Sequence, residues 1–235
     1  MLELREDSYQ QKVILPNLLR IARPTQGQHF LDLACGQGFF SRAFEKEGAH
    51  VTGVDLATEL IVRAKKLGPP TIRYMVGDAV AMPFLENDTF DVVVTVLAIQ
   101  NIEKYQEALS ECARVLVPAG RLLMVLNHPA FRVPHASSWG YDDAHNVQFR
   151  RIDRYLSEAR EEIIMHPGQA NSPQTISWHR PLQVYSKALA KAGFSISRME
   201  EWISNKQSDS GPRAAAENRA RKEFPLFLCL ECKKV

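Results

Sequence analysis

A glycine turn stands directly after a short apolar run and has the composition of a ligand-binding loop. The run at 29–34 is followed by Gly36 and Gly38, and helical periodicity begins at about Phe39. Glycine lets the backbone turn tightly and approach a ligand with no Cβ in the way. The first N–H groups of the following helix favour a carboxylate or a phosphate. The sequence therefore predicts an anion-binding turn at the end of a strand.

Two carboxylates follow the next two apolar runs. Asp55 ends the run at 49–55, where an acidic group can accept hydrogen bonds from ribose hydroxyls. Asp78 follows the run at 71–76 and can accept from an exocyclic amino group, while the Ala79 N–H can donate to a ring nitrogen. Because ligands bind at the carboxyl ends of parallel strands, these groups and the glycine turn predict a pocket for an adenosine with a carboxylate-bearing tail.

Two other kinds of nucleotide site do not match the chain. A dinucleotide fingerprint needs Gly or Ala at the sixth position of its glycine motif, and counting from Gly36 that position is Ser41. A P-loop needs G-K-[ST], which does not occur in the sequence.

The elements that must position these groups alternate along the chain. Apolar strands at 29–34, 49–55, 71–76, 91–97 and 121–126 are separated by helices at 39–46, 58–67 and 103–116. Such βαβ units predict a parallel sheet with right-handed crossovers. Pro16 interrupts an earlier helical pattern and predicts a kink or two short helices. After 127 the periodicity is lost, and it returns with a helix at 181–191 and two later strands.

Composition and charge describe an ordinary globular protein. The chain has 235 residues, is 45% hydrophobic and carries a net charge of +2, and its spread of Lys and Arg argues against a dedicated nucleic-acid partner. It has no apolar run of about 18 residues and no signal-like start, so we expect no membrane association and a cytoplasmic location. Cys229 and Cys232 would point to opposite faces of a strand, so they predict no shared metal.

The ordered motifs resemble a known family. LDLACGQG at 31–38 resembles the first motif of class I S-adenosylmethionine-dependent methyltransferases, of the small-molecule, methyltransferase type 11-like branch. VTGVDL, GDA, FDVVVTVLAIQNI and PAGRLLMV follow in that family's order and spacing. The resemblance is strong over 28–127 and looser over 181–235. It implies an α/β fold with a Rossmann-like, doubly wound, seven-stranded sheet, mostly parallel with an antiparallel last strand, and an insertion after the fifth strand.

The resemblance implies a domain plan and a cofactor site. The plan is an N-terminal helical cap at 1–27, a cofactor-binding core at 28–127, a lid or substrate insertion at 128–180 and the C-terminal part of the sheet at 181–235. The cofactor would be S-adenosylmethionine, leaving as S-adenosylhomocysteine. Its contacts would include Asp32. The other contacts would be Ala34, Gly36 and Gly38 around the methionine, Asp55 on the ribose, Leu56, Asp78 and Ala79 on the adenine, Val96 or Leu97 beside the sulfonium, and Tyr9 over the cofactor. Ala34 departs from the glycine that the family carries there.

The residues after the fourth strand bear on the acceptor. The N/D-P-P-Y signature of enzymes that methylate nucleic-acid bases is absent, and Gln100 stands where related small-molecule enzymes often carry His. A Gln orients rather than deprotonates. We therefore expect in-line transfer to an O, N or C nucleophile of a small molecule, with no metal and no covalent intermediate. The predicted substrate residues are Gln100, Asn101, Trp139, Tyr141 and Arg180.

A general base would have to come from the insertion or its edges. The candidates are His128, His135, His145, His166 and His179, of which His128 and His179 rank first by position. Residues 150–165 fit either a β-hairpin arm or a helix followed by a strand, and an arm could pair two chains into a homodimer.

Two alternatives stay open. An RNA or tRNA methyltransferase would need a basic face, for which Arg150, Arg151, Arg154 and Arg180 are available. A non-catalytic S-adenosylmethionine-binding protein could share the fold, since fold does not fix function.

Overall fold

A seven-stranded sheet forms the centre of the molecule. The computed structural model describes residues 8–164 and 174–235. The sheet order is β10 (Phe194–Trp202), β11 (Phe227–Lys234), β5 (Leu116–Asn127), β4 (Phe90–Val96), β1 (His29–Leu33), β2 (His50–Asp55) and β3 (Arg73–Val76). Only β11 among these seven runs against its neighbours, pairing antiparallel with both β10 and β5. This confirms the predicted fold class.

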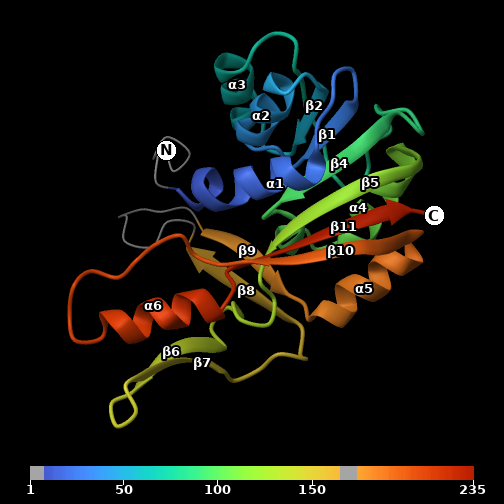
Figure 1. Cartoon of the computed structure of the whole chain (residues 1–235). Helices are drawn as coiled ribbons and strands as arrows, with labels where there is room; N and C mark the ends of the chain where they lie inside the picture. Colours follow the sequence, from blue (N-terminus) through green and yellow to red (C-terminus); the bar gives the residue numbers. More distant parts are fainter. Residues whose placement is uncertain (1–7, 165–173) are drawn as a thin grey trace.

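Helices cover both faces of the sheet, which gives three layers (Figure 1). One face packs against α1 (Leu15–Ala22), α2 (Phe39–Lys46) and α3 (Thr58–Leu67), and the other against α4 (Tyr105–Val115) and α5 (Leu182–Lys191). Val92 and Val94 of β4 lie in the first core and Val93 lies in the second. The all-apolar run of β4 therefore follows from burial on both faces.

The N-terminal segment is helical in two pieces. A π-helical turn at Gln10–Ile14 leads directly into α1, whose second residue is Pro16. Because proline has no N–H and fits the first turn of a helix, the change of helix type at this point confirms the predicted interruption.

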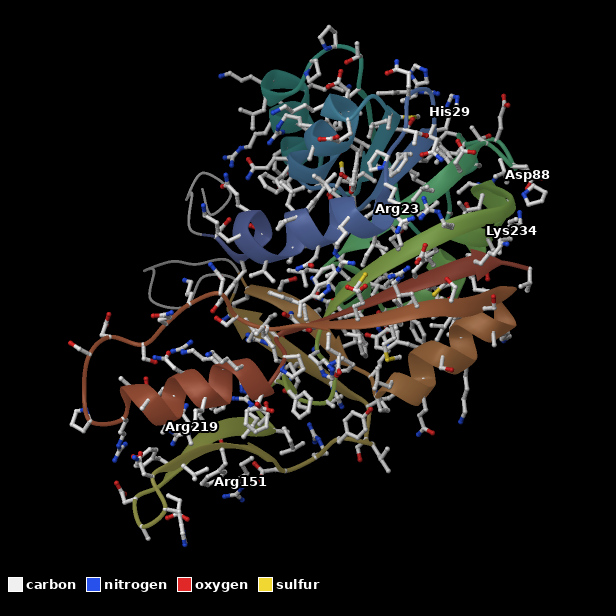
Figure 2. All side chains as sticks on the ribbon, viewed as in Figure 1. Arg23, His29, Asp88, Arg151, Arg219 and Lys234 are labelled. Atoms are coloured by element: carbon white, nitrogen blue, oxygen red, sulfur yellow. The ribbon has the colours of Figure 1, made fainter. Side chains whose placement is uncertain are left out.

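The insertion consists of two antiparallel hairpins below the sheet (Figure 1). The first pairs β6 (Ser137–Asp142) with β7 (Val147–Ile152), and the second pairs β8 (Ala159–Ile164) with β9 (Gln174–His179). The helix alternative for this stretch is wrong, because alternate residues of β7 are exposed and half-buried, the period of a strand. Helix α6 (Ala214–Glu223) lies over the first hairpin, where Arg219 donates to the Asn146 carbonyl at 2.8 Å (Figures 1 and 2).

The two cysteines of the last strand lie on opposite faces of the sheet. Cys229 packs in the core under α1–α3 and Cys232 in the core under α4 and α5, as predicted from their spacing. Burial raises the pKa of both thiols to about 12. Within the described ranges, no helix has the length and apolar character that crossing a membrane requires.

Candidate functional site

The carboxyl ends of β1, β2 and β3 line one cavity, which we call the β1–β3 cavity. It brings together five of the residues predicted for the cofactor: Ala34, Asp55, Leu56, Asp78 and Ala79, beside Leu33, Val54, Gly77 and Ile102. The cavity is built by topology, because β1 pairs with β2 and β2 with β3 in parallel register, so their ends meet at one edge.

Asp55 fastens the glycine turn to the neighbouring strand. Its two carboxylate oxygens accept hydrogen bonds from the Gly36 N–H at 2.8 Å and from the Ala57 N–H at 2.9 Å. Each carboxylate oxygen has two acceptor positions, so both can accept a further hydrogen bond. Asp55 thus has a structural role that the sequence did not reveal, in addition to any contact with a ligand.

Two glycines of the turn are required for different reasons. Gly36 has φ +57° and no atom within 4 Å of where a Cβ would stand, so the space above it is open. Gly38 has φ +78°, and a Cβ there would lie 2.1 Å from the Tyr74 hydroxyl. The backbone at Gly38 therefore approaches Tyr74 too closely for any side chain.

The β2 and β3 ends leave polar and apolar groups facing the cavity. The Asp78 carboxylate accepts from the Val80 N–H at 3.1 Å, and in the described part of the chain the Ala79 N–H makes no hydrogen bond. Leu56 is 69% exposed although it is a large apolar side chain. A flat, partly polar ligand could cover the exposed leucine and bond to the neighbouring Ala79 N–H and Asp78 carboxylate.

Six predicted cofactor residues do not line this cavity: the two turn glycines, Gly36 and Gly38, and four others. Asp32 is buried and accepts from the Ser41 hydroxyl at 2.5 Å, which ties α2 to β1. Val96 and Leu97 pack on the core under α1–α3. The Tyr9 hydroxyl lies 3.1 Å from the Ser204 hydroxyl, and its ring packs against Phe227. Their roles toward a cofactor stay predictions.

A second cavity, of about 290 Å³, lies under the insertion, and we call it the insertion cavity. Gln100, at the carboxyl end of β4, and Asn127, at the end of β5, form its sheet side. Gln100 is 7% exposed and its Oε1 atom is buried without a partner in the described structure. A buried acceptor of this kind is costly unless something donates to it.

Arg180 binds the backbone of the segment that lies between the two cavities. Its side chain is about 2% exposed and donates to the carbonyls of Ile102 at 2.9 Å and Glu103 at 3.0 Å. The guanidinium also lies over the Tyr105 ring. Arg180 thereby fixes the short segment after β4 that carries Gln100 into the insertion cavity and Ile102 into the β1–β3 cavity.

The two leading histidines differ in what their rings can do. The Ala130 N–H donates to Nδ1 of His128 and Nε2 lies 2.7 Å from Glu201, so both ring nitrogens are engaged. Burial lowers the pKa of His128, against the opposing effect of Glu201. His179 lines the insertion cavity and its Nε2 donates to the Tyr155 carbonyl at 2.7 Å, which leaves the lone pair of the neutral ring on Nδ1.

The geometry therefore favours His179 over His128 as a base, and both assignments stay predictions. His135 also lines the insertion cavity, and His145 pairs with Asp142 on the first hairpin. His166 lies outside the described residues.

The other predicted substrate residues lie apart from the insertion cavity. Asn101 is exposed at the segment after β4. Trp139 packs edge-on against Phe224, and Tyr141 donates to Asn146 at 2.6 Å on the first hairpin. Sequence reasoning missed Arg132 as a lining residue and gave Arg150 no role in a small-molecule site. Neither arginine stands in a periodic or motif context that could have placed it.

Comparison with known proteins agrees with this architecture. Residues 31–124 match the sequence model of a family described as "Methyltransferase domain". The ubiquinone/menaquinone biosynthesis C-methyltransferase UbiE of Cereibacter sphaeroides is 38% identical over 126 residues, which cover 51% of this chain and 49% of that protein. The malonyl-[acyl-carrier protein] O-methyltransferase of Erwinia billingiae is 37% identical over 113 residues, covering 48% and 44%. The chain thus matches about half the length of these curated relatives.

The likeness to solved structures extends over almost the whole chain. The crystal structure of an S-adenosylmethionine-dependent methyltransferase from Mesorhizobium loti superimposes with a TM-score of 0.74 at 26% identity, covering 93% of this chain and 96% of the other. A structure from Listeria monocytogenes, with a TM-score of 0.73 at 23% identity, shares the fold. The chain therefore carries a methyltransferase domain at 31–124 and has the fold of class I S-adenosylmethionine-dependent methyltransferases.

Proposed function

We propose that the protein transfers a methyl group from S-adenosylmethionine to an O, N or C nucleophile of a small molecule bound in the insertion cavity. The observation that carries the proposal is the shared segment after β4. Ile102 of this segment lines the β1–β3 cavity and Gln100 lines the insertion cavity. A donor held in one cavity and an acceptor held in the other would therefore approach each other at the same short stretch of backbone.

The residues of the β1–β3 cavity fit S-adenosylmethionine, the cofactor that the family implies. Asp55 has acceptor capacity for a ribose diol, and Asp78 and the Ala79 N–H form an acceptor–donor pair suited to the edge of an adenine. Leu56 offers an exposed apolar surface for the ring, and the open space above Gly36 leaves room for the methionine tail.

The chemistry needs positioning more than it needs catalytic groups. Bound S-adenosylmethionine would supply an electrophilic methyl group. The chain would hold the acceptor atom within about 3–3.5 Å on the line of the breaking C–S bond and exclude water. The electron pair of the acceptor would form the new bond, the sulfur would keep the electrons of the C–S bond, and the proton of the acceptor would pass to Nδ1 of His179 or to water.

A small-molecule acceptor is supported over RNA by the state of the arginines. Of the four arginines named for that alternative, Arg180 is buried, Arg154 is paired with Glu161 at 3.0 Å and Arg151 with Asp153 at 2.5 Å, while Arg150 lines the insertion cavity. Paired or buried guanidinium groups do not make the open basic face that RNA binding needs.

A cytoplasmic location and a homodimer through 128–180 belong to the same proposal, and sedimentation of the purified protein tests the dimer.

The cofactor half of the proposal is tested by replacing Asp55 with Asn. Asp55→Asn removes one charged acceptor, and we expect calorimetry to show S-adenosylhomocysteine binding about tenfold weaker or more. The matched control is Asp91→Asn. Asp91 also accepts a hydrogen bond from a backbone N–H, that of His29 at 2.8 Å, but it lies at the amino end of its strand, away from the cavity. Equal affinities of Asp55→Asn and wild type would remove Asp55 from the site. A wild type that does not bind S-adenosylhomocysteine would contradict the proposed function.

A further inference from the structure

The insertion cavity carries positive charge that its own walls do not balance. Arg132, Arg150 and Arg180 all contribute to its lining, and among the described residues that line it none is Asp or Glu. The stretch 165–173, which the structure does not describe, also contains neither Asp nor Glu. The charge balance of this cavity therefore differs from that of the whole chain, whose net charge is only +2.

The three guanidinium groups differ in their partners. Arg180 donates to backbone carbonyls, and its Nε lies 3.9 Å from the Glu158 carboxylate, so its charge is balanced by a residue outside the cavity lining. Arg150 donates from Nε to the Phe131 carbonyl at 2.8 Å and from one terminal nitrogen to the Ser137 hydroxyl at 2.6 Å. Because carbonyls and a hydroxyl do not cancel the charge, the positive charge of Arg150 still acts on the cavity, and its second terminal nitrogen remains a donor.

Arg132 is the least committed of the three. Its side chain is exposed to the cavity and, within the described ranges, makes no hydrogen bond or ion pair. Loss of bulk water around it lowers the pKa of Arg132, and burial together with the nearby charge of Arg132 lowers the pKa of Arg150. Two like charges directed at one cavity are unfavourable unless an anion enters between them.

The sheet side of the cavity offers an acceptor instead of a charge. Within the described residues, the Oε1 atom of Gln100 is buried and has no hydrogen-bond partner, so an O–H or N–H group of a bound molecule would satisfy it. Gln100 stands on the segment shared with the β1–β3 cavity. The donor group of the bound molecule would therefore lie on the side from which a methyl group would come.

We propose that the insertion cavity takes a small molecule with an oxyanion, a carboxylate or a phosphate, at one end and a hydroxyl or amino group at the other. Arg132 and Arg150 bind the oxyanion, and Gln100 accepts a hydrogen bond from the hydroxyl or amino group, which is the atom to be methylated. The assignment of that atom rests on the proposed function, whereas the binding of the oxyanion does not.

Inorganic phosphate is the probe for the oxyanion end. We expect phosphate to raise the Tm of the wild type more than sodium chloride does at the same ionic strength, and calorimetry to show saturable binding. Arg132→Gln should weaken that binding about tenfold or more, because it removes a charge-assisted hydrogen-bond donor. The control is Arg151→Gln, since Arg151 lies on β7 next to Arg150 but is not a lining residue of the cavity (Figure 2). Equal effects of phosphate and chloride, or equal affinities of wild type and Arg132→Gln, would overturn the proposal.

Organic probes test whether the cavity accepts a carboxylate, a phosphate ester or both. Titration with the cofactor product tests the methyltransferase proposal independently. Benzoate and phenyl phosphate should each compete with phosphate, while neutral benzamide should not; competition by benzamide as strong as that by benzoate contradicts the charge argument. S-adenosylhomocysteine is titrated into the same variants, and Arg132→Gln should bind it like wild type. Cofactor binding without phosphate binding overturns only the acceptor class. Phosphate binding without cofactor binding overturns only the methyltransferase proposal.

Discussion

At the scale of single residues, Ala34 is the position where the chain departs from the methyltransferase motif that it resembles and where the backbone is strained. Its φ is +59°, in the left-handed region that glycine adopts without cost. A non-glycine residue there costs about 1–2 kcal/mol. The sequence shows that Ala replaces Gly at this position, but only the structure shows that the replacement strains the backbone. The Ala34 methyl group can also narrow the β1–β3 cavity, which Ala34 lines.

We expect Ala34→Gly to raise the free energy of unfolding by about 1 kcal/mol, less than the full strain because glycine also makes the unfolded chain more flexible. Denaturant unfolding measures it. Ala119→Gly is the matched control, since Ala119 has φ +61° and is exposed near the start of β5, where the pairing of β5 with β4 shifts in register. Both variants should gain stability, and Ala34→Gly should also keep its affinity for S-adenosylhomocysteine. A loss of stability in Ala34→Gly would show that the strain argument fails.

At the scale of elements, the arginine contacts at the start of α5 join the insertion to the end of β4. Arg180 comes directly after β9 and before α5, yet its guanidinium donates to carbonyls of the segment after β4. The two cavities share that segment, so its position depends on a side chain from the other end of the insertion. Arg180 is a positioning residue in this arrangement.

We expect Arg180→Lys to lower the free energy of unfolding by about 2–3 kcal/mol, because an ammonium cannot reproduce the fork and leaves buried carbonyls unpaired. Hydrogen exchange should also speed up at Asn101 and Ile102, whose N–H groups bond within that segment. Arg154→Lys, which alters an exposed ion pair, should cost less than about 1 kcal/mol. Unchanged exchange at Asn101 and Ile102 would mean that Arg180 does not hold the segment.

The sequence predicts both the sheet and the β1–β3 cavity, because both follow from parallel-sheet topology. Strand ends in a parallel sheet meet at one edge, so the residue that follows each apolar run, such as Asp55 or Asp78, is placed by topology alone. No comparable rule places the side chains of the insertion. Its hairpins are half-exposed, and Arg132 and Arg150 enter the cavity from a loop and an edge strand whose positions depend on tertiary contacts.

At the scale of the whole molecule, helix α1 is fixed to two strands that lie far from it in the sequence, β5 and β10. Arg20 of α1 forms an ion pair with Glu200 of β10, and Arg121 of β5 donates to the Ile21 and Ala22 carbonyls. The hydrogen bond from Arg20, with further donation from Trp202 and Arg198, lowers the pKa of Glu200 to about 2.

This pKa gives the docking of α1 a defined dependence on pH. The folded carboxylate ionises at about pH 2 and the unfolded one near 4.5. The contribution to stability is therefore complete above about pH 5 and is lost as the pH falls through the folded pKa. Because Glu200 is partly exposed, we expect Glu200→Gln to cost about 1 kcal/mol at pH 7, and the difference from wild type to shrink steadily between pH 5 and 2.

Urea unfolding across this pH range measures the effect. Glu162→Gln is the control, since Glu162 is exposed and lies 3.7 Å from Arg160 within one hairpin; its curve should stay parallel to that of wild type. A Glu200→Gln difference that is constant with pH would contradict the lowered pKa. In that case neutral packing of α1 on the sheet, through Leu18 and Ile21, would be what joins the two ends of the chain.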